Sequence, residues 1–360
     1  MRIEKISIIG LGLIGGSIAK ALKNFSSLYT ISAYDNPETL EKAARLNVID
    51  GKLSSIEDSL DSDLIFICLP VNASIAAFEE LADKIRPDQI ITDVCSVKTV
   101  FQDIWDKKER SGTYIGGHPM TGKEKGGFDN SDPLLFENCV YILNESAKGS
   151  ESLDHLTEII HKLDSKITFL NPKVHDIIVA SVSHLPQLVS VSLINSANFK
   201  ESTLNFFDYA AGGFRDMTRI ASSEFNLWEP IIRKNGKNII QAIDNFVIDL
   251  EQIKNSIAKD DYGTLAYKFE SARMKRDEIP KSNKGFINQI YDVFVFVKDE
   301  PGVISIISTA LFESNINIKD IELLKIREGS GGTFRIAFVS ENDAERASEI
   351  IEKIGFTTKF

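Results

Sequence analysis

Short apolar runs alternate with amphipathic helical patterns over residues 1 to about 168. The runs with the composition of strands are Ile6–Ile9, Ile31–Tyr34, Leu64–Leu69, Ile90–Asp93, Tyr114–Ile115 and Val140–Leu143. Helical patterns separate them, among them Ser17–Lys23 and Pro37–Arg45. Because strands that alternate with helices are joined by right-handed crossovers, this pattern predicts a parallel, doubly wound α/β sheet.

From about Ile177 to Ile279 the strand signals give way to long helical periodicities. The clearest apolar stripe advances in steps of four and three residues through Ile239, Ile243, Phe246, Leu250, Ile253 and Ile257. Such a stripe has to be covered, either by packing inside the same chain or by a second copy in a dimer. Pro186 lies in the apolar stretch Ile177–Ile194 and is expected to kink or divide that helix.

The polar segment Pro280–Gly285 is typical of a linker, and ordered patterns resume after it. In chain order we expect a strand at Tyr291–Lys298, a helix at Val303–Ser314, strands at Ile318–Ile326 and Thr333–Ser340, a helix at Ala344–Ile354 and a short last strand at Phe356–Phe360. This order is that of a ferredoxin-like α+β domain. The predicted domains are therefore residues 1–168, 169–280 and 287–360.

Charge and composition restrict the partners. The formal net charge of −11 repels polyanions, which argues against nucleic acid and anionic membranes, and an anionic substrate then needs a local cluster of cations. Cys68, Cys95 and Cys139 are widely spaced and form no C-x-x-C pair, which argues against disulfides and a metal site. The first residues enter an apolar strand too soon for a leader peptide. No apolar run approaches the ~18 residues of a membrane span, so we expect a cytoplasmic protein.

The turn after the first strand has the spacing of a dinucleotide site. Gly10 allows the turn, Gly12 lets the backbone approach a pyrophosphate, and Gly15 lets helix and strand pack closely. The backbone N–H groups of Leu13 and Ile14 then face the phosphates at the positive end of the helix.

Three further positions extend this cofactor site. Asp35 ends the second strand, where a carboxylate accepts hydrogen bonds from ribose hydroxyls and repels a 2′-phosphate, so NAD is favoured over NADP. The alternative for Asp35 is a solvated turn residue. Leu69 and Pro70 end the strand that begins at Leu64, and the end of this strand usually meets the second half of the cofactor.

Two residues at strand ends are candidates for proton transfer. His118 follows Tyr114–Ile115 in a glycine-rich loop, and an imidazole suits the removal of a hydroxyl proton near neutral pH. Ser96 follows the preceding strand and either hydrogen-bonds a reacting hydroxyl or caps the next helix. The other histidines, His155, His161, His175 and His184, have no metal-ligand spacing, and we interpret them as surface or packing residues.

Arg215 and Arg219 supply the cation cluster that an acidic chain needs. They are four residues apart, share a helix face if the segment is helical, and are able to grip carboxylates bidentately. Asp216 and Glu224 offer the alternative of a surface ion-pair network. The preceding pair of glycines favours a binding site.

Five motifs occur together in order along the chain. They are Gly10–Ser17, Asp93–Lys98, Gly117–Gly122, Ser183–Pro186 and Gly213–Ala221. Together they resemble the prephenate/arogenate dehydrogenase family, and the tail resembles an ACT regulatory domain. The resemblance implies a Rossmann domain, an all-α helical dimerisation domain and the ACT domain, with the active site between the first two.

The resemblance also implies roles for individual residues. His118 takes the proton from the ring hydroxyl of the substrate, and Ser96 assists it. Arg219 holds a substrate carboxylate, Arg215 and Ser183 line the pocket, and Trp228 reaches in from a partner subunit. The implied reaction is the NAD-dependent oxidative decarboxylation of prephenate to 4-hydroxyphenylpyruvate, a step of tyrosine biosynthesis.

One position departs from the family pattern. Relatives commonly place a second histidine after Ser-His-Leu-Pro, whereas this chain has Gln187, a neutral amide. Prephenate is the favoured substrate, with arogenate as the alternative. A β-hydroxyacid dehydrogenase or imine reductase would leave the two arginines and the tail unused. A non-catalytic sensor of NAD and an amino acid is a further alternative.

The ACT-like tail implies an amino-acid effector. Tyrosine, the end product of the pathway, is the expected ligand, and Asp299, Gly302 and Asn315 are the residues expected to touch it. The alternative is a domain used only for assembly.

Overall fold

The computed structural model describes residues 3–25, 28–123, 125–197, 200–201, 204–278, 291–298, 300–327 and 331–360. The chain divides into two compact units, residues 1–279 and 280–360, and each has its own hydrophobic core. The predicted linker Pro280–Gly285 lies outside the described residues.

A six-stranded parallel sheet forms the first part of the larger unit, as predicted. Its strands are β1 (Lys5–Ile9), β2 (Thr30–Tyr34), β3 (Gly51–Lys52), β4 (Leu64–Ile67), β5 (Ile90–Asp93) and β6 (Thr113–Tyr114). Their order is β3-β2-β1-β4-β5-β6. The order reverses direction between β1 and β4, and such a reversal is where doubly wound sheets bind their ligands.

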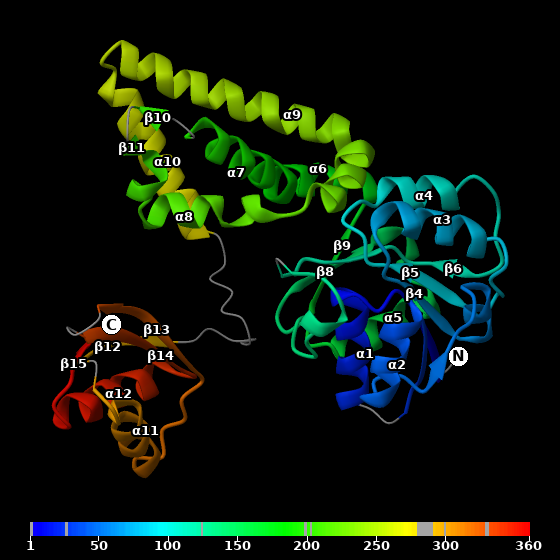
Figure 1. Ribbon diagram of the computed structural model, residues 1–360, viewed down its shortest axis with the longest axis horizontal. Coiled ribbons are helices and arrows are strands. Elements are labelled where there is room, and N and C mark those ends of the chain that lie inside the picture. The colour runs from blue at the N-terminus through cyan, green and yellow to red at the C-terminus, as the bar shows by residue number, and fades with distance from the viewer. Residues whose placement is uncertain are drawn as a thin grey trace. The chain divides into compact units, whose positions relative to one another are not determined.

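Helices cover both faces of this sheet (Figure 1). One face packs against α1 (Leu13–Phe25), α2 (Pro37–Arg45) and α5 (Glu151–His161), and the other against α3 (Val71–Leu81) and α4 (Thr99–Trp105). Successive residues of β1 serve the two layers, since Ile8 belongs to the first core and Ile9 to the second. The sheet is therefore a rigid platform for the loops at its carboxyl edge.

A second, three-stranded sheet corrects the prediction for Val140–Leu143. The strands β7 (Gly117–Pro119), β8 (Val140–Asn144) and β9 (Lys166–Leu170) form it, with β7 antiparallel and β9 parallel to β8. His118 lies in β7, paired with Ile142, and not in a loop as expected. The chain leaves the large sheet after β6, which is only two residues long.

The rest of the larger unit is helical, as predicted. It contains α6 (Pro172–Val179), a π-helical turn (Ala180–His184), α7 (Leu185–Ser196), α8 (Gly212–Thr218), a 3₁₀ turn (Arg219–Ser222), α9 (Phe225–Ala258) and α10 (Tyr262–Glu278). A short hairpin of β10 (Lys200–Glu201) and β11 (Leu204–Asn205) precedes α8. The π turn stands where Pro186 was expected to disturb the helix, because the proline has no N–H for the carbonyl of Val182.

The continuous helical stretch from α6 to α7 contradicts the expectation about apolar runs. Pro172–Ser196 is 25 residues long and has the length and composition of a membrane span, with 28% of its most apolar window buried. The expectation failed because serines interrupt the run without making it polar overall. Figure 1 shows this stretch alongside α9, and it buries polar side chains, including His184, Gln187 and Ser190, inside the helical bundle.

The apolar stripe of α9 is covered only in part. Ile239 and Ile243 pack against Ala180 and its neighbours in the same chain. Farther along, Phe246 and Leu250 are exposed, at 39% and 52% of their surfaces. Packing within the chain therefore accounts for one half of the stripe, and the other half is exposed.

The smaller unit has the predicted ferredoxin-like order. It consists of β12 (Tyr291–Val297), α11 (Val303–Glu313), β13 (Asp320–Arg327), β14 (Gly331–Phe338), α12 (Glu341–Lys353) and β15 (Thr357–Lys359). The strands form an antiparallel sheet in the order β13-β14-β12-β15. Both helices pack into one core with this sheet, as Figure 1 shows.

Candidate functional site

The glycine turn between β1 and α1 has the geometry that its sequence predicts. Gly10 has a φ of +96°, and a Cβ there would lie 2.8 Å from the carbonyl oxygen of Cys68. A Cβ at Gly15 would lie 1.9 Å from the carbonyl oxygen of Gly10, so helix and turn touch directly. A Cβ at Gly12 would meet nothing within 4 Å, which leaves this backbone open to a ligand. The helix α1 starts at Leu13, so the N–H groups of its first turn, including that of Ile14, have no acceptor within the helix.

Asp35 is built into the turn and is more than a solvated residue. Its Oδ2 accepts a hydrogen bond from the backbone N–H of Leu11 at 2.6 Å, and its Oδ1 accepts one from the N–H of Asn36 at 2.7 Å. The first contact ties the end of β2 to the glycine turn. The carboxylate oxygens have further lone pairs for ribose hydroxyls.

Leu69 and Pro70 lie beyond the end of β4 rather than at it. The strand ends at Ile67, and Pro70 is the residue before the first turn of α3. Leu69 has its side chain 3.0 Å from a Cβ built on Gly10, so it packs against the glycine turn. The two residues therefore flank the same carboxyl edge of the sheet.

His118 heads a chain of hydrogen-bonded side chains. Its Nδ1 lies 2.8 Å from Nε2 of His175, and Nδ1 of His175 lies 2.8 Å from Oδ1 of Asp176. The carboxylate of Asp176 also accepts hydrogen bonds from the backbone N–H groups of Lys98, at 2.8 Å, and Thr99, at 3.0 Å. Asp176 is thus an acceptor on both of its oxygens.

These hydrogen bonds fix which ring nitrogen of His118 and of His175 carries a proton. Because the Asp176 carboxylate only accepts, Nδ1 of His175 carries a proton and Nε2 of His175 is an acceptor. Nδ1 of His118 must then donate to it, which leaves Nε2 of neutral His118 with a free lone pair. A free imidazole lone pair at a sheet edge is the requirement for a general base.

Burial keeps His118 and His175 neutral. Burial, followed by the charges of His175 and Lys98, lowers the pKa of His118 well below its ordinary value of 6.5. Burial also lowers the pKa of His175, although Asp176 opposes the shift. For Asp176, burial alone raises the pKa, but hydrogen bonds from His175, Thr99 and Lys98 outweigh it and lower it. The result is an ionised carboxylate behind two neutral imidazoles.

A buried ion pair supports the loop that carries Ser96. Lys98 and Asp93 are fully buried and form a salt bridge, and Asp93 also accepts a hydrogen bond from the hydroxyl of Tyr114 at 2.9 Å. Ser96 is half-buried in the bend between them. It is not the helix cap considered above, because α4 starts at Thr99 and its cap position is Lys98. A Cβ at Gly117 would lie 2.8 Å from the Asp93 carbonyl oxygen, so β7 and this loop adjoin.

His175 and His184 are buried, as the packing alternative predicts, but they also have a polar role that the sequence did not predict. Both are 1% exposed and belong to hydrogen-bonded networks. His155, by contrast, forms an ion pair with Glu151, with the carboxylate largely exposed. The signal that could have found His175 was the His-Asp pair inside an apolar helix, since buried polar groups need partners.

Of the two arginines, only Arg215 lies in an α-helix. The helix α8 ends at Thr218, and Arg219 begins the 3₁₀ turn, so the two guanidinium groups do not share one helix face. Both side chains are exposed, and Nε of Arg215 donates to the carbonyl of Ala210 at 3.1 Å. Nε2 of Gln187 donates to the carbonyl of Ile220 at 2.9 Å. That bond attaches the turn of Arg219 to α7.

Ser183 and Trp228 lie near the same helical junction. Ser183 is half-buried in the π turn, next to His184. The Trp228 ring stands edge-on to the His184 ring of its own chain, with the ring centroids 5.9 Å apart. Asn235 connects this junction with Asp176, because its Nδ2 donates to the Asp176 carbonyl and lies 3.3 Å from Nδ1 of His184.

The tail separates the predicted effector residues. Gly302 has a φ of +92°, precedes α11 and lines a pocket of about 450 Å³. Asn315 follows the opposite end of α11 and also has a positive φ, of 53°. Asp299 lies outside the described residues. In the described part of the chain, no cluster of three or more His, Cys, Asp or Glu side chains is arranged to hold a metal ion.

Comparisons with known proteins match nearly the whole chain. Residues 18–169 match the nucleotide-binding domain of prephenate dehydrogenase, residues 171–271 match its dimerization domain, and residues 291–356 match the ACT domain. The prephenate dehydrogenase of Bacillus subtilis is 35% identical over 355 residues, which are 97% of this chain and 96% of that protein. The chain belongs to the prephenate dehydrogenase family.

Two solved structures extend this family assignment. Prephenate dehydrogenase from A. aeolicus, in complex with hydroxyphenyl propionate and NAD+, is 30% identical with a TM-score of 0.70, covering 78% of this chain and 99% of that one. Synechocystis arogenate dehydrogenase is 27% identical with a TM-score of 0.66, covering 77% and 100%. The protein is thus a dehydrogenase of the NAD-dependent type, as its glycine turn and Asp35 predict.

Proposed function

We propose that this protein catalyses the NAD-dependent oxidative decarboxylation of prephenate to 4-hydroxyphenylpyruvate in tyrosine biosynthesis. The observation that carries the proposal is the imidazole of His118, whose Nδ1 is engaged by His175 and whose Nε2 is therefore a free base. Its neighbour Gly117 lies against Asp93, the last residue of β5, at the carboxyl edge of the nucleotide-binding sheet. Similarity to prephenate dehydrogenases along nearly the full chain supports the choice of substrate.

Residues of the first domain hold the cofactor in this proposal. The backbone of Gly10, Gly12 and Gly15, with the N–H groups of Leu13 and Ile14, receives the pyrophosphate. Asp35 accepts the hydroxyls of the adenosine ribose. Leu69 and Pro70 border the nicotinamide half. NAD, when bound, supplies the hydride acceptor.

The protein residues handle the proton and the charges. Nε2 of His118 removes the hydroxyl proton as hydride leaves the carbinol carbon, and Ser96 hydrogen-bonds the same hydroxyl. The ring carboxylate departs as carbon dioxide, its bonding electrons complete the aromatic ring, and the proton held by His118 returns to the phenolate oxygen. Arg219 and Arg215 bind carboxylate and position the dianion, so the enzyme contributes mainly orientation and electrostatic stabilisation.

Ser183, Gln187 and Trp228 are proposed to line the pocket at the side chain of the substrate. A neutral amide at 187 fits the keto acid of prephenate, whereas arogenate carries an amino acid there. The similarity to an arogenate dehydrogenase keeps that substrate as the second candidate.

We also propose a homodimer, in a cytoplasmic location, with tyrosine as its effector. The exposed half of the α9 stripe supplies an apolar surface for the second copy, and the dimerization-domain match supports this role. The domain limits 1–168, 169–280 and 287–360 stay a prediction.

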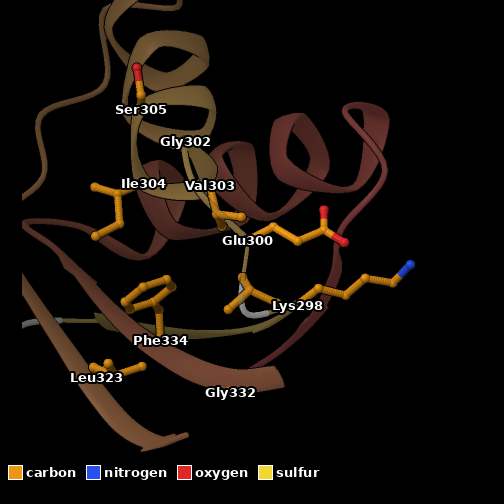
Figure 2. Close-up of a pocket in the computed structure, with 10 residues that line it drawn as sticks. Lys298, Glu300, Gly302, Val303, Ile304, Ser305, Leu323, Gly332 and Phe334 are labelled. Carbon is orange, nitrogen blue, oxygen red and sulfur yellow. The ribbon is translucent and has the colours of Figure 1, made fainter. Parts of the chain in front are cut away.

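The pocket beside Gly302 is the proposed effector site. Figure 2 shows Phe334 and Leu323 on the sheet facing Ile304 on α11, while the charged ends of Lys298 and Glu300 extend away from them. An apolar floor with a positive and a negative group at the rim suits a zwitterionic amino acid with a large side chain. Asp299 and Asn315 remain proposed contacts.

One assay tests the proposed activity. NADH formation is measured with prephenate, arogenate and simple 2- and 3-hydroxy acids, with wild type, His118→Ala and Arg219→Ala. We expect turnover of prephenate, a loss of about 100-fold or more in kcat for His118→Ala with NAD affinity nearly unchanged, and mainly a raised KM for Arg219→Ala. Wild-type kinetics in both variants would refute the site, and binding without NADH formation would indicate a sensor.

A further inference from the structure

The long helix α9 bends at a single residue. Asn235 is the position within it that has non-helical angles, with φ −113° and ψ 17°. Pro230 is five residues earlier, and a proline disturbs the turn that precedes it, so it does not account for this bend. A Cβ at Gly236 would meet nothing within 4 Å, so close packing does not require the glycine either.

The side chain of Asn235 accounts for the bend. It is 3% exposed, and both its amide nitrogen and its oxygen are engaged. Nδ2 donates to the backbone carbonyl of Asp176 at 2.7 Å and lies 3.3 Å from Nδ1 of His184. Oδ1 accepts from Nδ2 of Asn238 at 2.7 Å. The bend therefore brings an amide of α9 to two residues of the α6–α7 stretch.

These contacts determine the orientation of the amide and the tautomer of His184. A backbone carbonyl only accepts, so the atom that faces Asp176 must be nitrogen and not oxygen. Nδ1 of His184 consequently faces a donor and is an acceptor, which places the His184 proton on Nε2, a buried atom that has no hydrogen-bond partner among the described residues. Burial lowers the pKa of His184 to about 4, in agreement with a neutral ring.

Asp176 is held from both ends by this arrangement. Its carboxylate is fixed by His175 and by the backbone of Lys98 and Thr99, and its carbonyl is fixed by Asn235. The same amide orients His184, against which the Trp228 ring stands edge-on.

We propose that Asn235 is a positioning residue, which sets the tautomer of His184 and holds Asp176 so that His118 keeps its free base. The inference rests on the proposed function only for the role of His118. Two ionisable groups influence the pKa of His184: Asp176 raises it and His175 lowers it. His184 in turn lowers the pKa of His118.

Nitrogen-15 NMR of the histidine rings tests the inference in the whole protein. Wild type is expected to show His184 as a neutral Nε2–H ring, assigned by its loss in His184→Gln. In Asn235→Asp, a carboxylate faces His184, and the pKa of the His184 ring is expected to rise by about two units or more. Asn255→Asp, an exposed asparagine on the same helix, is the control and should leave it unchanged. An Nδ1–H ring in wild type, or an unchanged titration in Asn235→Asp, overturns the proposal.

A second variant covers the event that Asn235→Asp does not fold. Asn235→Leu removes the donor while keeping the same branched skeleton of heavy atoms, so the His184 ring is expected to become a mixture of tautomers. Its kcat should fall about tenfold or more, with the KM for NAD within about twofold of wild type, whereas Asn255→Leu keeps both. A shifted tautomer with unchanged kcat overturns the positioning role. If wild type itself does not turn over prephenate, the proposed function fails, and the NMR arm still decides the tautomer.

Discussion

Asp176 does more for this site than its own charge suggests. It accepts from two backbone N–H groups and from His175, and its carbonyl accepts from Asn235. A carboxylate with so many donors stays ionised, so it always presents an acceptor to His175. The direction of every hydrogen bond up to His118 follows from this single residue.

The substitution Asp176→Asn is therefore a sharp test. It replaces the carboxylate with an amide that both donates and accepts, so the proton on Nδ1 of His175 would no longer be fixed. We expect kcat to fall on the order of 100-fold or more, as for other carboxylates that orient a catalytic imidazole. Steady-state assays with NAD titration measure it. The control is Asp88→Asn, at an exposed aspartate. Equal kcat in both variants would contradict the role of Asp176 in orienting His175 and His118.

Local motifs predicted one part of this site and missed another. The glycines and Asp35 stand at strand ends, and His118 follows the short strand β6 closely, so a turn or a sheet edge gives sequence evidence for each. His175 lies 57 residues from His118, and Asn235 lies 59 residues from Asp176. No spacing rule connects such distances, because the contacts exist only once α6 and α9 pack together.

At the scale of elements, apolar periodicity predicted helices and the large sheet well. Pairing partners were harder to predict. Residues Gly117–Pro119 contain a glycine and a proline and are too short to show alternation, yet they form β7 because β8 supplies the hydrogen bonds. Similarly, Arg215 and Arg219 looked like one helix face, but α8 ends between them.

The exposed half of α9 carries a prediction about assembly. Leu250 is 52% exposed in the middle of an apolar stripe, so burial against a second copy would account for it. Leu250→Asp places a charge on that surface and is expected to shift the protein from dimer to monomer, measured by light scattering after size-exclusion chromatography. The exposed Lys107→Glu should stay dimeric. A wild-type protein that is already monomeric would contradict the proposal.

On the scale of the whole molecule, buried neutral histidines make stability depend on pH. The folded-state pKa values of His118 and His175 are lowered, and that of His184 is about 4, whereas an unfolded histidine titrates near 6.5. Below pH 6.5 the unfolded chain therefore binds more protons than the folded one. Stability should be complete above this pH and be lost progressively down to about pH 4.

Thermal unfolding between pH 7.5 and 4.5 measures this loss. The melting temperature should fall as the pH drops, and the slope should be shallower in His184→Gln. His161→Gln, an exposed histidine of α5, should keep the wild-type slope. A melting temperature that is independent of pH across about 6.5 to 4.5 would contradict the burial argument.

The ACT unit has its own core, so its contribution can be separated from turnover. Tyrosine should inhibit NADH formation by the intact chain and leave a chain shortened to residues 1–279 unaffected, because the pocket beside Gly302 is then absent. Dose–response curves on both chains measure this. Inhibition of the shortened chain would place tyrosine at the active site. If tyrosine inhibits neither chain, assembly is left as the role of the unit.

Gln187 places a limit on how this enzyme can be redesigned. Its amide donates to the backbone beside Arg219, so the residue proposed to choose between a keto and an amino substrate also anchors the turn proposed to bind carboxylate. On that proposal, replacing Gln187 alone would weaken carboxylate binding while altering substrate selectivity. An engineer, or natural selection, must supply a replacement donor for the Ile220 carbonyl in the same step.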